Sequence, residues 1–105
     1  MLVAFSVAPS TSAEQGSVHD AVAAAVQVVR DSGLPNQTDS MFTTIEGSWD
    51  ECLAVVKQAC EVVGRFGPRV SLVLKADIRP GYSGELSGKI ERLEAALNRG
   101  AAPNA

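Results

Sequence analysis

The segment from Met41 to Glu51 constrains the fold of this chain more than any other. Residues 41–46 are rich in β-branched and apolar side chains, which is typical of a strand, and Gly47 ends it. Ser48 and Glu51 have the spacing of a capping box, in which each side chain satisfies a free backbone N–H at a helix start. The segment therefore predicts a strand that passes directly into a helix.

The residues before this segment have the patterns of a strand and a helix. Residues 2–7 form an apolar run that Pro9 ends, which predicts a buried strand. After a polar loop at residues 10–16, Ser17 can cap a helix that Ser32-Gly33 ends. Residues 36–40 form either a separate short strand or the first part of one bent strand with residues 41–46. The expected inward face of the first helix is Val18, Val22, Ala25, Val26 and Val29.

The second half of the chain repeats this alternation. The second helix ends before Pro68, and a strand follows at residues 70–79, in which alternate side chains share a face. The expected inward residues of the second helix are Leu53, Val56, Cys60 and Val63. A third amphipathic helix is expected to end near Gly100, because apolar residues recur at helical spacing at Leu86, Ile90, Leu93 and Leu97.

The order of elements predicts a ferredoxin-like α+β sandwich, βαββαβ, with an added C-terminal helix. We expect a single domain over residues 1–100 and a flexible tail at residues 101–105. In such an antiparallel sheet the first strand lies between the third and the last. That arrangement would place Ser6 beside Glu46 or Thr44 on one side and beside Lys75 or Asp77 on the other.

The first strand also predicts an oligomer. It is apolar on both faces, whereas the helices of such a small domain cover one face of the sheet. We therefore expect the open face to pack against the sheet of a second copy, in a homodimer or homotetramer.

Composition and charge argue against several functional classes. A net charge of -3 argues against nucleic-acid binding, since phosphate binding needs a basic face. No apolar stretch approaches the roughly 20 residues of a membrane span. Lys and Arg are absent from the first 29 positions, which argues against a signal peptide, so a cytoplasmic location is expected. Cys52 and Cys60 would lie about 12 Å apart in one helix, too far for a disulfide. With His19 as the one histidine, no His/Cys metal site is expected.

Several stretches of the chain resemble the thiamine-binding protein family, which consists of small proteins of ferredoxin-like fold. The similarity runs from Val3 to about Leu97, and the order and spacing of the stretches carry it. They are Phe5-Ser6-Val7-Ala8-Pro9, Ser17-Val18, Ser32-Gly33-Leu34, Met41 with Thr43 and Glu46-Gly47, Trp49-Asp50-Glu51, Arg69-Val70 and Lys75-Ala76-Asp77-Ile78-Arg79.

The resemblance implies a non-enzymatic protein, without cofactor, that binds thiamine or its hydroxymethylpyrimidine part. It also implies dimers or tetramers formed by sheet packing. The family pattern places its polar positions at Ser6, Thr43, Glu46, Asp77 and Arg79.

The chemistry of an aminopyrimidine is compatible with these residue types. A carboxylate such as Glu46 can accept from the amino group, and a hydroxyl can donate to a ring nitrogen. Met41, Phe42 or Trp49 can supply apolar walls. The candidate ligand-binding residues are Ser6, Met41, Thr43, Thr44, Glu46, Asp77 and Arg79.

Structural alternatives remain open for all of these residues. Ser6 could serve only close packing, Met41 could be a core residue, and both threonines suit a strand whether or not they bind a ligand. Glu46 could be a strand-end carboxylate beside a helix N-terminus. Asp77 and Arg79 could form an ion pair or an intersubunit contact.

Three functional hypotheses follow. The first is a small-molecule binder for thiamine or a pyrimidine relative. The second is a structural or regulatory homo-oligomer with a different small ligand. The third is an enzyme, such as a cofactor-free oxygenase of the dimeric α+β barrel type, although neither cysteine nor His19 lies in an evident catalytic arrangement.

Overall fold

A computed structural model describes residues 1–9 and 15–100 of the chain. The expected tail at residues 101–105 and most of the expected loop at residues 10–16 lie outside the described residues. The elements are β1 (Leu2–Pro9), α1 (Gln15–Asp31), β2 (Asn36–Thr38), β3 (Thr43–Glu46), α2 (Trp49–Val63), β4 (Val70–Asp77) and α3 (Glu85–Asn98).

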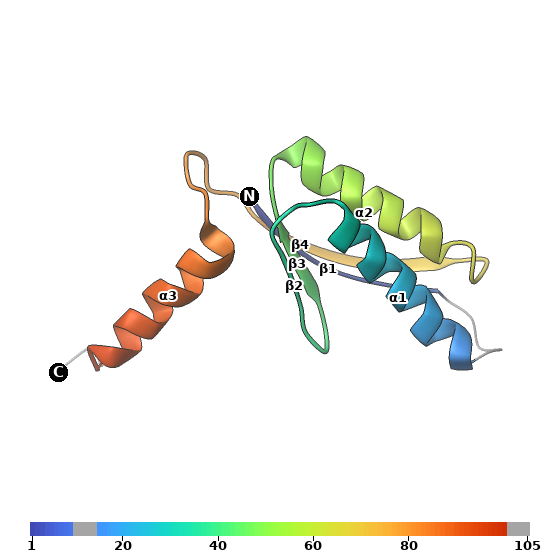
Figure 1. Ribbon diagram of the computed structural model, residues 1–105, viewed down its shortest axis with the longest axis horizontal. Helices are drawn as coiled ribbons and strands as arrows, with labels where there is room; N and C mark the ends of the chain where they lie inside the picture. Colours follow the sequence, from blue (N-terminus) through green and yellow to red (C-terminus); the bar gives the residue numbers. More distant parts are fainter. Residues whose placement is uncertain (10–14, 101–105) are drawn as a thin grey trace.

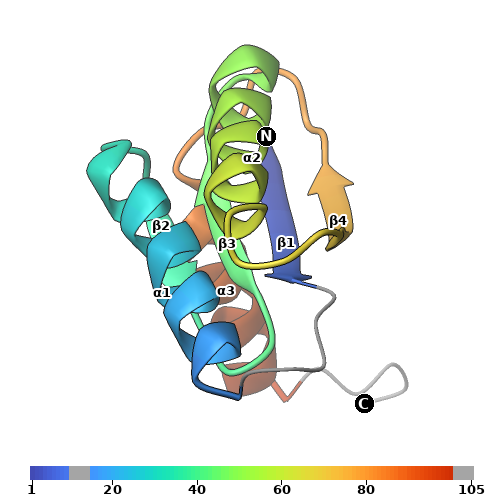
Figure 2. The ribbon, with the colours of Figure 1, turned by 90° about the vertical axis from the view of Figure 1, so that its right-hand side faces the viewer.

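The four strands form one antiparallel sheet in the order β2-β3-β1-β4. Helices α1 and α2 lie side by side on one face of this sheet (Figure 2). The start of α3 approaches the other face near β3, and the rest of that face is open in the single chain. This arrangement confirms the predicted ferredoxin-like α+β fold, with β1 between β3 and β4. Of the two alternatives for residues 36–46, the structure has two short strands, β2 and β3, joined by a loop.

The core lies between the sheet and the two helices. Every second residue of β1 faces the helices, so Val3 and Phe5 are buried beside Ile45 of β3. The other buried apolar residues are Val7, Ala21, Ala25, Val29, Cys52, Val55, Val56, Ala59 and Val63.

The helix faces differ in part from the sequence prediction. In α1 Ala25 and Val29 are buried as predicted, but Ala21 is also fully buried, while Val22 is 41% exposed. In α2 Cys52 is fully buried, while Leu53 is 42% exposed. Both helices carry alanine, valine, leucine or cysteine around most of their circumference, so the apolar pattern alone does not fix the face that packs on the sheet.

Element boundaries follow local chemistry where a cap is present. The capping box of α2 is confirmed, because the Glu51 N–H donates to Ser48 Oγ at 3.1 Å and the Ser48 N–H donates to Glu51 Oε1 at 2.9 Å. Gly33 ends α1 with a φ of 77°, a conformation that favours glycine. The prediction that Ser17 caps α1 is wrong, because the helix already begins at Gln15. A preferred capping residue does not fix a helix start when the residues before it also accept helical geometry.

Helix α3 is amphipathic as predicted, but it projects away from the rest of the molecule (Figure 1). It touches the sheet near β3, and the outer side chains Ile90, Leu93 and Leu97 are 48%, 58% and 59% exposed. The radius of gyration is 16.4 Å, whereas a compact chain of this length has a value of about 13 Å. The single chain therefore leaves the apolar side of α3 uncovered.

None of the helices in the described part of the chain combines the length and the apolar character that a membrane span requires.

Candidate functional site

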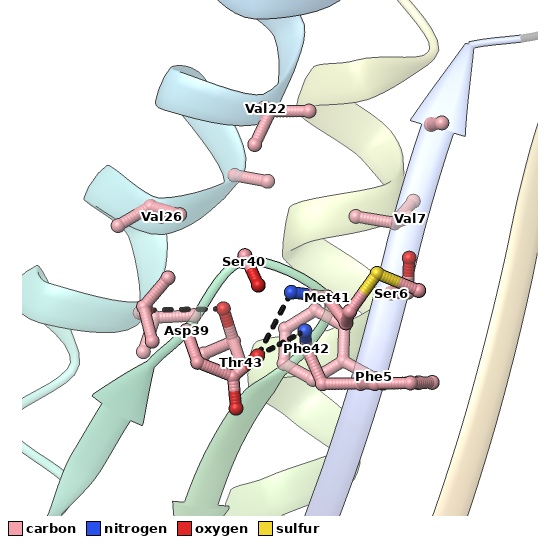
Figure 3. Close-up of a pocket in the computed structure, with 14 residues that line it drawn as sticks. Phe5, Ser6, Val7, Val22, Val26, Asp39, Ser40, Met41, Phe42 and Thr43 are labelled. Carbon is pink, nitrogen blue, oxygen red and sulfur yellow. Dashed lines mark hydrogen bonds between the residues drawn. The ribbon is translucent and has the colours of Figure 1, made fainter.

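One pocket exists because β1 is longer than β3. The pairing of β1 with β3 stops at Phe5 opposite Thr43, whereas β1 continues to pair with β4 as far as Pro9 opposite Val70. Residues 6–8 therefore lack a strand partner on the β3 side. The space between this bare edge, α1 and the loop at residues 39–42 is a pocket of about 180 Å³ (Figure 3).

The walls of the pocket are mainly apolar. Helix α1 contributes one side, the core residues of β1 form the floor, and Phe42 comes from the β2–β3 loop. Met41 also lines the pocket and is 72% exposed, so it stands at the mouth. The apolar lining residues are Phe5, Val7, Ala8, Val22, Ala25, Val26, Val29, Met41 and Phe42.

Asp39 is the acidic residue of the pocket lining. Its Oδ1 accepts the backbone N–H of Met41 at 2.8 Å and that of Phe42 at 2.9 Å, which closes the β2–β3 loop as an Asx turn (Figure 3). These two bonds lower the pKa of Asp39, the bond from Phe42 contributing most. A carboxylate with one oxygen committed to the turn has its second oxygen available to a ligand.

A second polar group of the pocket belongs to the backbone. Met1 and Gly47 exchange two hydrogen bonds, of 2.7 and 3.1 Å, so the odd-numbered residues of β1 direct their N–H and C=O groups toward β3. Val7 continues this alternation beyond the end of β3 and lines the pocket. Its N–H and C=O therefore face the pocket, where a flat ligand with a donor and an acceptor on one edge can pair with them.

Hydroxyl groups complete the polar lining. Thr43 is buried, and its hydroxyl lies 3.1 Å from that of Thr38 on the neighbouring strand. Ser6 and Ser40 also line the pocket. The two threonine hydroxyls can each donate or accept, so this pair adapts to either pattern on a ligand.

The structure divides the seven predicted ligand residues among three places. Ser6, Met41 and Thr43 line the pocket. Thr44 faces the opposite side of the sheet, where it lines a second depression together with Leu2, Gln37, Asp39, Glu85, Leu86, Lys89 and Ile90. Glu46, Asp77 and Arg79 lie at the base of α3, outside both lining sets. Trp49, which was expected as a wall, is absent from both sets, whereas Phe42 is present in the first.

The residues at the base of α3 make intramolecular contacts. The Glu46 carboxylate accepts the backbone N–H groups of Glu85 at 2.9 Å and of Leu86 at 3.1 Å. Arg79 lies 3.5 Å from the Glu85 carboxylate, and Asp77 accepts from Lys89 at 2.6 Å. That hydrogen bond and the positive charge of Lys89 lower the pKa of Asp77. Asp77 and Arg79 each bind a residue of α3, so the ion pair suggested between them is not formed.

The expected neighbours of Ser6 are also corrected. Ser6 is opposite Val73, while Glu46 and Asp77 are both opposite Leu2, and Thr44 and Lys75 are both opposite Ala4. The observed neighbours of Ser6 are displaced from the predicted ones by two or four residues along the strand. Because the displacement is even, the predicted side chains lie on the same face of the sheet as Ser6, but not beside it. The pairing of Met1 with Gly47 sets this register from the first residue of the chain.

Sequence reasoning missed Asp39 and the bare edge at Val7. Asp39-Ser40 is a frequent turn pair, and this signal was available had residues 39–42 been interpreted as a hairpin loop. The edge at Val7 depends on the relative lengths of two strands that are distant in sequence, and no local pattern reports it.

Comparison with known proteins gives a consistent result. The family model described as "Thiamine-binding protein" matches residues 3–94. The chain belongs to this family. It is 51% identical over 100 residues to UPF0045 protein Mb1933 from Mycobacterium bovis, a match that covers 94% of this chain and 96% of the relative. The family predicted from the sequence is therefore confirmed.

Two solved structures share the fold. Hypothetical protein MJ1052 from Methanocaldococcus jannascii has a TM-score of 0.77 at 28% identity, covering 89% of this chain and 94% of its own. A domain of unknown function, DUF77, from Bacillus cereus has a TM-score of 0.71 at 31% identity, covering 81% and 83%. Membership of this family supports a small-molecule binding role for the chain.

Proposed function

We propose that this protein binds the aminopyrimidine ring of thiamine, or of its hydroxymethylpyrimidine part, in the pocket beneath α1. The observation that carries the proposal is the position of Asp39 and of the bare β1 edge at Val7 in the lining of one apolar-walled pocket. The family description supplies the class of ligand.

The donors and acceptors of the ligand match those of the pocket. An exocyclic amino group can donate to Asp39 or to the Val7 C=O, and the adjacent ring nitrogen can accept from the Val7 N–H or from the Thr43 hydroxyl. The two faces of the ring are apolar and fit the walls around Val26 and Phe42. Three classes of polar group thus meet one edge of a planar ring.

The size of the pocket favours part of thiamine rather than all of it. Sites for drug-sized ligands have volumes of about 300 Å³ or more, whereas this pocket has about 180 Å³. We therefore place the pyrimidine inside and the cationic thiazolium at the mouth. There it lies near Met41 and gains from the negative charge of Asp39.

We propose binding without turnover. Asp39 contributes charge, but among the described residues that line the pocket there is no histidine, lysine or cysteine to activate the serine and threonine hydroxyls. Binding without turnover distinguishes this proposal from the hypothesis of a cofactor-free enzyme.

We also propose that the protein acts as a homodimer or homotetramer. The 14-residue helix α3 is short for an isolated helix in water, and its four apolar side chains repeat at the spacing of a packing seam. Each such side chain contributes about 1.5–3 kcal/mol when buried. The open sheet face and α3 together form a surface that a second copy can cover, with the second depression beneath it.

Calorimetric titration tests the binding proposal. Thiamine and hydroxymethylpyrimidine should both release heat with the natural protein and remain unchanged afterwards by chromatography. Thr43→Val should lower the affinity, whereas Thr44→Val is a matched control, because the neighbouring threonine faces the other side of the sheet. Absence of heat with both ligands, or an equal loss of affinity in both variants, would contradict binding in this pocket.

A further inference from the structure

Three consecutive residues of the β2–β3 loop form the rim of the pocket beneath α1. Asp39, Ser40 and Met41 all line the pocket and are all exposed, whereas Thr43 is buried inside it. The rim lies on the loop between α1 and β1 (Figure 3). In the proposed binding mode, the substituent of the pyrimidine ring that leaves the pocket therefore passes this rim.

The rim has a negative charge that the turn holds in place. Asp39 Oδ1 accepts the backbone N–H groups of Phe42 and Met41, at 2.9 and 2.8 Å. These bonds also keep the pKa of Asp39 below its ordinary value, so the carboxylate is ionised at neutral pH. None of the described residues that line the pocket is a lysine or an arginine, so no cation within the lining neutralises this charge.

The elements around the pocket add to the negative charge. The pocket lies beneath residues 22–29, in the C-terminal half of α1, so the nearer end of the helix dipole is the negative one. β1, α1 and residues 36–43 together contain three carboxylates, of Asp20, Asp31 and Asp39, and one guanidinium, of Arg30. Phosphate groups are usually bound by arginine, lysine or the free N–H groups of a helix N-terminus. The surroundings of this pocket therefore oppose a phosphate.

We infer that the pocket selects the unphosphorylated ligand and excludes its phosphate esters. The inference rests on the function proposed above and specifies which form of the ligand is bound. A phosphate monoester has about -1.5 to -2 charges at neutral pH, and its attachment to the outer part of the ligand brings these charges to a rim that is itself negative. Thiamine is a cation and gains from the same Asp39 carboxylate.

The point of attachment predicts which ester is excluded more strongly. In hydroxymethylpyrimidine, the hydroxyl group is on the methylene carbon that joins the thiazolium in thiamine. A phosphate on this hydroxyl lies directly at the rim, with no cation between it and Asp39. In thiamine phosphate, the ester is on the hydroxyethyl arm beyond the thiazolium, where solvent screens it and the cationic ring intervenes. We therefore expect stronger exclusion of the pyrimidine ester than of the thiamine ester.

Paired calorimetric titrations test the inference. We expect each ester to bind on the order of tenfold or more weakly than its unphosphorylated parent, with the larger ratio for the hydroxymethylpyrimidine pair. Both ratios should be smaller at ~0.5 M salt than at ~0.05 M, because salt screens charges at an exposed rim. Esters that bind as tightly as their parents would overturn the inference and leave the proposed function intact. Failure of all four compounds to bind would overturn both.

Asp39→Asn tests the source of the selectivity. The variant keeps an acceptor for the turn, and both members of each pair lose the same contact with the charged oxygen. Only the ester is relieved of repulsion, so the ratio of parent to ester affinity should fall several-fold. Asp50→Asn is the matched control, since Asp50 is exposed at the start of α2 and lies outside both lining sets. Equal ratios in the two variants would contradict selection by Asp39.

Ser40→Lys tests the same claim by a gain of binding. The substitution places a cation on the rim beside Asp39, at an exposed position, without removing the carboxylate. Affinity for both esters should rise several-fold, while affinity for thiamine should fall or stay constant. Ser87→Lys, exposed on α3, adds the same charge away from the pocket and should change neither. If Ser40→Lys leaves the ester affinities at those of Ser87→Lys, charge at the rim does not select the ligand and the inference is wrong.

Discussion

The Glu46 carboxylate accepts the backbone N–H of Glu85 at 2.9 Å, from a position 39 residues earlier in the chain. The residue that precedes α3, Gly84, has a φ of 69° and no side chain to cap the helix. Glu46 supplies that cap from the end of β3, with both oxygens engaged and the residue buried. A negative charge there also complements the helix dipole. Glu46 thus fixes the direction in which α3 leaves the sheet.

Glu46→Gln should loosen α3 while leaving the pocket beneath α1 unchanged. The amide retains one acceptor oxygen but loses the charge, and hydrogen bonds to charged groups contribute about 1.5–3 kcal/mol. We expect faster amide exchange at Glu85 and Leu86, a lower melting temperature and unchanged affinity for thiamine. Glu91→Gln, on the exposed side of α3, is the matched control. A loss of ligand affinity with unchanged amide exchange would instead indicate that Glu46 binds the ligand.

Asp39→Asn should remove the negative charge of this side chain while keeping the turn at residues 39–42. Asparagine can still accept from the N–H groups of Met41 and Phe42, so the loop and the melting temperature should be nearly unchanged. Affinity for thiamine should fall on the order of tenfold, because a charged acceptor becomes a neutral one. Calorimetry measures the change, with Asp31→Asn on the exposed end of α1 as the control. Equal affinities in the two variants would contradict a role for Asp39.

Stability should decline on the acid side. Hydrogen bonds from Phe42, Ser48 and Lys89 respectively lower the pKa values of Asp39, Glu51 and Asp77 in the folded state. The unfolded chain then binds more protons, so the stabilisation is complete above the ordinary carboxyl pKa of about 4 and disappears as the pH falls below it. Urea midpoints should be lower at pH ~3 than at pH ~7.

A lysine substitution isolates the contribution of Asp77 to this pH dependence. Lys89→Gln removes the hydrogen bond that contributes most to the lowered pKa of Asp77. The substitution should therefore reduce the difference between the urea midpoints at the two pH values. Lys57→Gln on the exposed side of α2 should not. An identical acid dependence in the two variants would contradict this origin.

Ser48→Ala should destabilise the protein by about 1 kcal/mol, the usual effect of removing an N-cap side chain. The N–H of Glu51 would lose its acceptor, and the reciprocal bond to the Ser48 backbone would be less constrained. Denaturant unfolding measures the difference, and Ser87→Ala within α3 is an exposed control. If Ser48→Ala lowers the free energy of unfolding no more than the control does, the capping box contributes little to stability.

The fold could be predicted because its signals are local. The Ser48–Glu51 capping box, the turn glycine Gly33 and the alternation in β1 each define an element without tertiary information. Strand order then follows from the ferredoxin-like topology. The inward face of α1 could be predicted only in part: Ala25 and Val29 are buried as expected, whereas Val22 is exposed and Ala21 is buried. Alanine and valine occupy nearly every side of that helix, so the pattern does not fix its rotation.

The site could be predicted in part. Ser6, Met41 and Thr43 line the pocket as expected from the family pattern, whereas Asp39 required knowledge of the hairpin loop. The sequence leaves open, beside a ligand role, that Glu46 is a strand-end carboxylate next to a helix N-terminus. The helix concerned is α3, 39 residues further on, rather than the one that follows directly. Proximity in sequence suggests that Glu46 caps the helix that follows it directly, α2. The tertiary structure instead brings the start of α3 to Glu46.

Backbone amide shifts during titration with thiamine test the central claim most directly. We predict that the perturbed amides lie at residues 6–8, at residues 38–43 and along the pocket side of α1 around Val26. The amides of Glu85 and Leu86, at the base of α3, should remain unperturbed. Perturbations confined to the base of α3, or a saturating titration with no change at residues 6–8 and 38–43, would contradict the account.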